Sequence, residues 1–385
     1  MSFDSNNRYN YNFPTSIRFG KGVIDELGPH LKEQGLKKAL IVSDPGLVKL
    51  PVFEKVMSMI QSQGIAVAVF SEIAKNPVKS NVLKGADAFL QSGCDSIVGF
   101  GGGASMDVAR AIALKVHHPL DLFAYDDAIG GDRFVTEPVP YFVTVPTTSG
   151  TGSEVGRSTV IADDVTHEKK ILFSPRLMAK KVFADPELTM GLPAFVTAAT
   201  GMDALTHCVE AYLAKGFSPL CDGVALEGIR LIAESLEKAT LNPDLESRAK
   251  MMMGALMGAT AFQKGLGIVH SLAHPLSTLV DMHHGLANAV MIPYGMQFNH
   301  SVSGPRMKVI AETIGLQNPS AEGFIAWLRD LNQKLGIPAN LKSLNVNSSH
   351  VEKLADLAIK DPCHGSNAKP VTQADFLKIY QEAIQ

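Results

Sequence analysis

The feature that most constrains the fold is a change in the hydrophobic pattern near residue 190. Before it, short apolar runs alternate with segments of helical periodicity, whereas after it the chain shows helical periodicity only. The clearest apolar runs are KALIVS (38–43), IAVAVF (65–70), SIVGF (96–100) and PYFVTV (140–145). Uninterrupted apolar runs of this kind are typical of parallel strands that are covered on both faces. Strand–helix alternation therefore predicts a doubly wound parallel sheet, followed by an all-helical region.

Further strands and helices complete this prediction. Short strands are expected near 158–162, 169–173 and 181–184, and helices near 51–62, 79–92, 105–116, 220–238, 246–264 and 321–335. A chain of 385 residues is too long for one core of ordinary size. We therefore predict an α/β domain over residues 1–191 and a helical domain over residues 192–385.

Composition excludes several classes of protein. The net charge of −3 provides no basic footprint for nucleic acid or for an acidic membrane surface. The N-terminus is polar, and no apolar run is long enough to span a bilayer. Four cysteines without CxxC spacing argue against a disulfide framework. These observations predict a cytoplasmic protein that acts on small molecules, with no nucleic-acid or membrane partner.

A glycine-rich turn follows the third of the clear apolar runs. In GFGGGASMDVARAIALKV, Gly102 and Gly103 allow close approach of a ligand, and the next helix directs its first N–H groups outward. This geometry binds phosphate, although the sequence is neither GxGxxG nor a Walker loop. The alternative is an ordinary tight turn with Ser105 as its cap.

Two other polar segments follow predicted strands. TVPTTSGTGSE (144–154) supplies hydroxyl groups from Thr147 and Thr148, and Asp44 ends the run KALIVS. Ligands of open α/β sheets bind outside the carboxyl ends of the strands. An acid at that place can bind an adenosine ribose and repel a 2′-phosphate, which favours NAD over NADP. Asp44 can equally be a turn residue, because Asp-Pro-Gly is a strong turn signal.

The second half contains a candidate metal site. In ATGMDALTHCVEAY, Asp203 and His207 are four residues apart and so share one face of a helix. Four histidines follow in GIVHSLAHPLSTLVDMHHGLANAV (267–290), namely His270, His274, His283 and His284. Burying a carboxylate without a partner destabilises the fold by about 2 kcal/mol or more, and a bound divalent cation removes that penalty. Imidazole with one carboxylate suits Fe(II), Zn(II), Mn(II) or Co(II), but spacing alone does not select among these histidines.

The motifs together resemble the iron-containing (group III) alcohol dehydrogenases. The resemblance runs from FGKG (19–22) through GGGASMD, PTTSGTGSE, ATGMDALTH, GIVHSLAHPL and HHGLANAV. It implies a Rossmann-like N-terminal dinucleotide-binding domain and a helical C-terminal domain for metal and substrate, an architecture shared with dehydroquinate synthase. It also implies NAD(H), Fe(II) or another divalent metal such as Zn(II), a small alcohol or aldehyde substrate, and a homodimer or higher oligomer. YNFPTSIRFG (11–20) is the expected edge strand of that dimer.

The resemblance also assigns residues. The implied metal ligands are Asp203, His207, His270 and His284, and His274 is left beside the metal, facing the substrate. The implied dinucleotide contacts are Asp44, Asn76, Gly102, Gly103, Thr147, Thr148 and Lys169. This sequence departs from the family pattern at Gly156 and Ser158 and in HGSNAKPVT. Cys363 and His364 are expected to shape the substrate channel.

The sequence therefore predicts a metal-dependent NAD(H) alcohol dehydrogenase that transfers hydride between the nicotinamide and a small primary alcohol or diol. The alternatives are a hydroxyacid–oxoacid transhydrogenase or a 4-hydroxybutyrate dehydrogenase. A lyase of the dehydroquinate synthase type would need more basic residues to hold its substrate than the apolar pocket segments provide. A non-catalytic nucleotide-binding protein would bind no metal and oxidise no alcohol.

Overall fold

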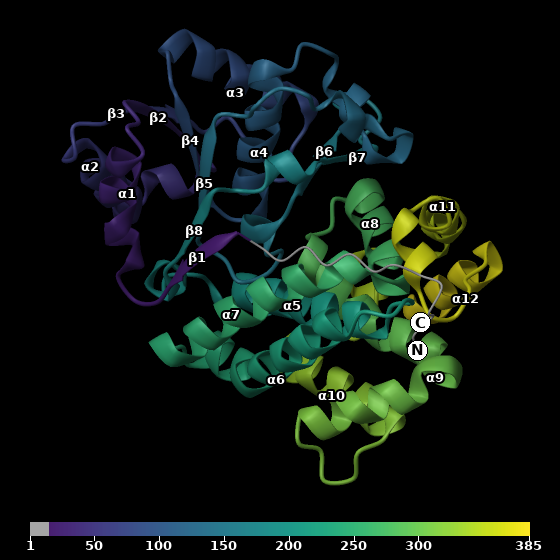
Figure 1. Cartoon of the computed structure of the whole chain (residues 1–385). Helices are drawn as coiled ribbons and strands as arrows, with labels where there is room; N and C mark the ends of the chain where they lie inside the picture. The colour runs from purple at the N-terminus through teal and green to yellow at the C-terminus, as the bar shows by residue number, and fades with distance from the viewer. Residues whose placement is uncertain (1–14) are drawn as a thin grey trace. The chain divides into compact units, whose positions relative to one another are not determined.

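Two compact units make up the part of the chain that the structure, a computed structural model, describes, which is residues 15–385. The α/β unit comprises residues 15–148 and 153–191, and the helical unit comprises residues 149–152 and 192–385 (Figure 1).

The α/β unit is built on a six-stranded sheet in which every pairing is parallel. Its order is β1-β8-β5-β4-β2-β3. The bounds are β1 (Ser16–Phe19), β2 (Lys38–Val42), β3 (Ala66–Phe70), β4 (Ser96–Gly101), β5 (Tyr141–Pro146) and β8 (Lys181–Ala184). The two remaining predicted strands, β6 (Ser158–Ala162) and β7 (Lys169–Phe173), form a separate antiparallel ribbon.

Both faces of this sheet are covered, as the continuous apolar runs predict. Ala39 and Ile41 of β2 belong to the core formed with α1 and α2, whereas Leu40 and Val42 belong to the core formed with α3 and α4. The helices are α1 (Leu27–Glu33), α2 (Pro51–Gln61), α3 (Lys79–Ser92) and α4 (Gly103–His117). Since successive side chains of a strand point to opposite faces, the alternation confirms the predicted doubly wound sheet.

The helical unit contains no strand between residues 192 and 385, all of which the structure describes. Its helices are α5 (Ala194–Leu213), α6 (Pro219–Leu241), α7 (Leu245–Ala261), α8 (Ile268–Val280), α9 (His284–Thr313), α10 (Ala321–Lys334), α11 (Ser348–Ala358) and α12 (Gln373–Ala383). The helix α5 packs against α6, α7 and α9 and is buried along most of its length. Polar side chains on α5 therefore need partners inside the unit. Of the helices described, not one combines the length and the apolar character that crossing a membrane demands.

The tetrapeptide 149–152 leaves the α/β unit for four residues and packs with the helices. Gly152 has a φ of 61°, and a Cβ added there would lie 2.2 Å from the Cβ of Ala259 on α7. Only glycine allows this close approach, which explains the glycine in the predicted TSGTGSE loop.

The YNFPTSIRFG segment is described in part. β1 lies at one edge of the sheet and pairs with β8, whereas residues 11–14 lie outside the described chain.

Candidate metal centre and dinucleotide site

One face of α5 carries three polar side chains in a buried setting. Asp203, His207 and Glu210 follow each other at spacings of four and three residues, which places them on the same side of the helix. Asp203 and Glu210 are each 2% exposed and His207 is 5% exposed. A core helix tolerates this set only if the carboxylates meet donors or a cation.

Two further helices bring imidazoles to Asp203. His270 lies in the first turn of α8, and His284 is the first residue of α9. His284 Nε2 is 3.4 Å from Asp203 Oδ1, His207 Nε2 is 3.9 Å from the same atom, and the rings of His207 and His270 stack at 4.8 Å. One donor atom from each of these four residues lies within 4.8 Å of the others, so the group could hold a metal ion. One carboxylate oxygen with three imidazole nitrogens is a donor set that suits Fe(II) or Zn(II).

The neighbouring histidine, His283, is not in this cluster. It is the N-cap of α9, and its ring meets Phe195 edge to face at 6.2 Å. The structure thus separates His284 from His283, which spacing could not do.

The two most buried imidazoles of the cluster differ in how readily they take up a proton. Burial lowers the pKa of His207 to about 4, so this imidazole is neutral at pH 7. Burial also lowers the pKa of His270, but the hydrogen bond and negative charge of Glu210 oppose that effect, and the net pKa is raised. A neutral imidazole is the form that binds a metal.

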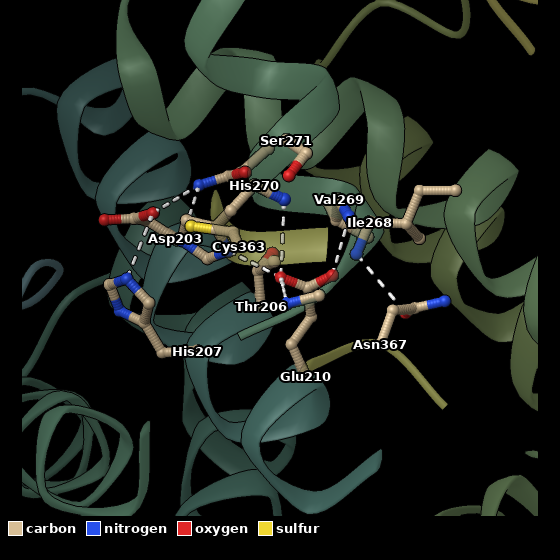
Figure 2. A network of polar contacts seen from close by, with 12 residues as sticks. Asp203, Thr206, His207, Glu210, Ile268, Val269, His270, Ser271, Cys363 and Asn367 are labelled. Carbon is tan, nitrogen blue, oxygen red and sulfur yellow. Dashed lines mark hydrogen bonds and ion pairs between the residues drawn. The ribbon is translucent and has the colours of Figure 1, made fainter. Parts of the chain in front are cut away.

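Two residues that the sequence reasoning missed support the cluster. Asn288, one turn beyond His284, donates from Nδ2 to Asp203 Oδ1 at 2.7 Å. Glu210 accepts from His270 Nδ1 at 2.6 Å and from the backbone at the start of α8 (Figure 2). Helical spacing from His284 and His207 is the sequence signal that could have found both.

His274 lies next to the cluster, where its ring stacks on His284 at a centroid distance of 5.2 Å. Its Nδ1 contacts Asp361 Oδ2 at 2.6 Å, and Asp361 Oδ1 accepts from Ser271 Oγ and from the Cys363 backbone. Asp361 is 87 residues from His274 in the chain, and no local pattern reveals the pair.

His274, Asp361 and Cys363 also lie close enough to form a second donor group. Both oxygens of Asp361 already accept hydrogen bonds. Burial raises the pKa of the Cys363 thiol well above its usual range, which disfavours the thiolate that binds metals. This group is therefore a hydrogen-bonded support for His274.

The α/β unit gathers five of the seven predicted dinucleotide residues. Chain order reverses between β2 and β4, and Val42 pairs with Gly99 there, so the residues that follow these two strands are neighbours. Asp44 follows β2, and its Oδ2 lies 3.5 Å from where a Cβ on Gly101 would stand. Open sheets bind their ligands at such a switch point. The residues at the carboxyl ends of β2, β4 and β5 are Asp44, Gly102, Gly103, Thr147 and Thr148.

The turn between β4 and α4 has an open helix start. Gly101 has a φ of 148°, and Gly102 is the N-cap of α4 without any side-chain capping bond. The alternative in which Ser105 caps the turn is wrong, because Ser105 is buried and its hydroxyl has no partner among the described residues. Thr147 N donates to Gly101 O at 3.0 Å, which joins the two predicted loops.

Asn76 precedes α3 and Lys169 begins β7, so neither directly follows β2, β4 or β5. Lys169 pairs with Ala162 in that ribbon, and Ala162 N donates to Pro77 O at 2.8 Å. The Asn76-Pro77 turn and Lys169 thus meet at one end of the ribbon, although no sequence proximity links them.

Asp44 also has the turn role that the sequence left open. Its Oδ1 accepts from the backbone N–H groups of Gly46 and Leu47, each at 2.9 Å. Oδ2 has no donor among the described residues.

Fold and donor set together define a class, the metalloenzymes that combine a doubly wound sheet with a helical unit. Comparison with known proteins makes the class specific. Residues 14–186 match the model of the iron-containing alcohol dehydrogenases, and residues 197–384 match that of the C-terminal region of the same family. The chain belongs to the iron-containing alcohol dehydrogenase family, which confirms the predicted family, fold and enzyme class.

Similar proteins cover the chain almost completely. The 4-hydroxybutyrate dehydrogenase of Cupriavidus necator is 37% identical over 381 residues, which are 96% of this chain and 98% of that protein. The 1,3-propanediol dehydrogenase of Klebsiella pneumoniae is 36% identical over 98% of this chain and 99% of its own. A crystal structure of 1,3-propanediol oxidoreductase has a TM-score of 0.93 at 37% identity and covers 98% of this chain and 100% of its own.

Proposed function

We propose that Asp203, His207, His270 and His284 hold a divalent metal, Fe(II) in the first place, and that the enzyme interconverts a small primary alcohol and its aldehyde with NAD(H). The observation that carries this proposal is the convergence of one carboxylate oxygen and three imidazole nitrogens within 4.8 Å. Family membership supports the choice of iron, and Zn(II) has compatible donor chemistry.

The bound metal would supply Lewis-acid polarisation of the alcohol oxygen, and the nicotinamide would supply hydride chemistry. The chain's own contribution is position and charge. Asn288 donates to one oxygen of Asp203 and thereby fixes the carboxylate. Phe262, whose ring lies 5.1 Å from that of His207, forms an apolar wall beside the cluster.

For the dinucleotide, we propose that the first turn of α4 binds phosphate through its outward N–H groups, with Gly102 and Gly103 permitting close approach. Thr147 and Thr148 supply hydroxyl groups from the loop after β5. Asp44 would accept the hydroxyl groups of an adenosine ribose on Oδ2, which favours NAD over NADP. Asn76 and Lys169 complete the proposed set. Two relatives are described as an NAD-dependent methanol dehydrogenase and as a sulfoacetaldehyde reductase in complex with NAD⁺, which supports this cofactor.

We propose that His274 contacts the substrate. Asp361 accepts from its Nδ1, so that Nε2 remains available to hold the substrate hydroxyl or a proton. Cys363 and His364 follow the Asp361-Pro362 pair and are assigned to the wall of the substrate channel. A His274→Ala enzyme with unchanged rate and pH profile would contradict this role.

The substrates named for relatives indicate the chemical class. They include 4-hydroxybutyrate, 1,3-propanediol, methanol and lactaldehyde. Each is a short molecule with a hydroxyl or carbonyl group at the end of the chain. We therefore propose a short terminal alcohol or aldehyde, and the relative from Cupriavidus necator makes 4-hydroxybutyrate a specific candidate.

Two finer predictions remain proposals. A homodimer formed along the edge strand β1 is supported by the position of β1 at the end of the sheet. A cytoplasmic location is supported by four cysteines that are all free thiols.

The test combines a substrate panel with a matched pair of histidine variants. Purified enzyme is stripped with a chelator, reconstituted with Fe(II) or Zn(II), and assayed on terminal alcohols with NAD and with NADP. His284→Ala should lose bound metal and turnover, whereas His283→Ala should retain metal because its ring faces Phe195. Full activity in a demonstrably metal-free preparation would contradict the proposal.

A further inference from the structure

Glu210 is a fully buried carboxylate that is outside the set of four proposed metal ligands. It follows His207 by one turn of α5, and three backbone N–H groups and the Nδ1 of His270 lie within hydrogen-bond distance of its oxygens. Oε2 accepts from the backbone N–H groups of Gly267 and His270 at 3.1 and 3.3 Å, and it lies 2.6 Å from His270 Nδ1. Oε1 accepts from the Val269 backbone at 2.6 Å. These donors compensate the burial of the charge.

The same contacts complete the start of α8. The first N–H groups of a helix have no partner within the helix. Glu210 satisfies Gly267, Val269 and His270, and Asn367 Oδ1 accepts from Ile268 N at 3.3 Å (Figure 2). Two side chains from distant segments thus fix the position of the turn that carries His270.

We propose that Glu210 is a positioning residue that sets the Nδ1–H tautomer of His270 and holds Nε2 of that ring toward Asp203 and His207. Three backbone N–H groups donate to this carboxylate, so it is an acceptor toward the ring as well, which places the proton on Nδ1 and the lone pair on Nε2. His270 Nε2 is 3.4 Å from Asn288 Nδ2, which itself lies 2.7 Å from Asp203 Oδ1. Nε2, to which the Asn288 amide can donate, therefore faces the donor cluster.

The rival explanation is that Glu210 is a helix cap and nothing more. Asn367 offers a matched control, because it caps the same turn at Ile268 but has no contact with the imidazole. It also exchanges hydrogen bonds with Asn299, so its removal disturbs the fold locally as well. A role confined to capping predicts a loss of metal affinity that follows the number of N–H groups left without an acceptor, three for Glu210 and one for Asn367, with no change in the tautomer of His270.

The experiment titrates chelator-stripped, full-length protein with Co(II) in competition with a chelating dye. We expect Glu210→Gln to weaken Co(II) binding by about 10- to 100-fold and to alter the visible spectrum of the bound ion. The amide introduces an NH₂ group among donors, and it removes the charge that fixes the ring. Asn367→Ala should change the affinity by less than about threefold, since the imidazole keeps its partner. Equal loss in both variants, or none in Glu210→Gln, would overturn the proposal.

A second measurement uses wild-type protein and so does not depend on whether a variant folds. Nitrogen-15 labelling of histidine reports the tautomer of each ring, and we expect a histidine with a protonated Nδ1 and a bare Nε2 whose resonance changes on addition of Zn(II). An Nε2–H tautomer for His270 would overturn the proposal.

The inference rests on the proposed metal site, but the two can fail separately. Wild-type protein that binds no Co(II) contradicts the metal site, whereas equal binding by wild type and Glu210→Gln contradicts only the role of Glu210.

Discussion

Each unit of this enzyme buries one glutamate, and the two glutamates have opposite surroundings. Glu210 in the helical unit is 2% exposed and accepts four hydrogen bonds. Glu154 in the α/β unit is 1% exposed, and neither of its carboxylate oxygens has a hydrogen-bond partner among the described residues. Burial raises the pKa of Glu154 to about 7, and its own backbone N–H and the charge of Arg110 only partly oppose this. Burial alone therefore does not distinguish a carboxylate that supports a site; the number of donors does.

The largest effect is expected from removal of Glu210. Glu210→Ala would leave four buried N–H groups without their acceptor and should lower the free energy of unfolding by about 4 kcal/mol. Urea unfolding of the metal-free protein, followed by helical circular dichroism, measures this loss. A loss below about 1 kcal/mol would remove the contrast with Glu154.

The second prediction concerns Glu154, whose charged form destabilises the native state, whereas Glu210 stabilises it. Its folded pKa of about 7 lies above the ordinary value of 4.5, so the native state binds an extra proton between these pH values. The free energy of unfolding should therefore fall as pH rises through this window, by about 3 kcal/mol in all. Glu154→Gln has no such charge to bury and should flatten the profile. Urea midpoints at several pH values test this, and parallel profiles for both proteins would contradict it.

Asp361 is a third carboxylate for the comparison, and like Glu210 it accepts several hydrogen bonds. The charge and hydrogen bond of His274, together with Ser271 and the Cys363 backbone, outweigh burial and hold the pKa of Asp361 well below its usual range. Its contribution to stability is therefore present above the unfolded pKa of 3.8 and is lost as pH falls below that value. Asp361→Asn should cost about 2 kcal/mol at pH 7, because two donors keep an acceptor and one loses it. The difference between variant and wild type should narrow at pH 3.5, whereas Glu154→Gln should differ most at high pH.

The sequence predicted the sheet more completely than it predicted the hydrogen-bond partners of the buried carboxylates. Apolar runs such as KALIVS reveal strands because burial on both faces leaves an unbroken pattern. Asp203 and His207 are recognisable because a four-residue spacing on one helix is local information. Glu210 has the same kind of local signal, yet its donors come from α8 and depend on how two helices pack. Asp361 and Glu154 have no local signal at all, because one is defined by a histidine 87 residues away and the other by a lack of donors.

The smallest predicted effect concerns Asp44, because the two oxygens of this one carboxylate differ in their hydrogen bonds. Oδ1 of Asp44 accepts from Gly46 and Leu47, as the oxygens of Glu210 accept from their donors, whereas Oδ2 resembles Glu154 and has no donor among the described residues. If Oδ2 binds the ribose of NAD, Asp44→Gly should raise the preference for NADP over NAD by about 10-fold, or roughly 1.4 kcal/mol. Loss of the two turn bonds alone would weaken both cofactors equally. The ratio of kcat/KM for NADP and NAD separates these outcomes, and Asp44→Asn is the control that keeps the turn acceptor while removing the charge. A shift in Asp44→Asn close to that in Asp44→Gly would assign the effect to charge on Oδ2, and an unchanged ratio in both would leave Asp44 as a turn residue only.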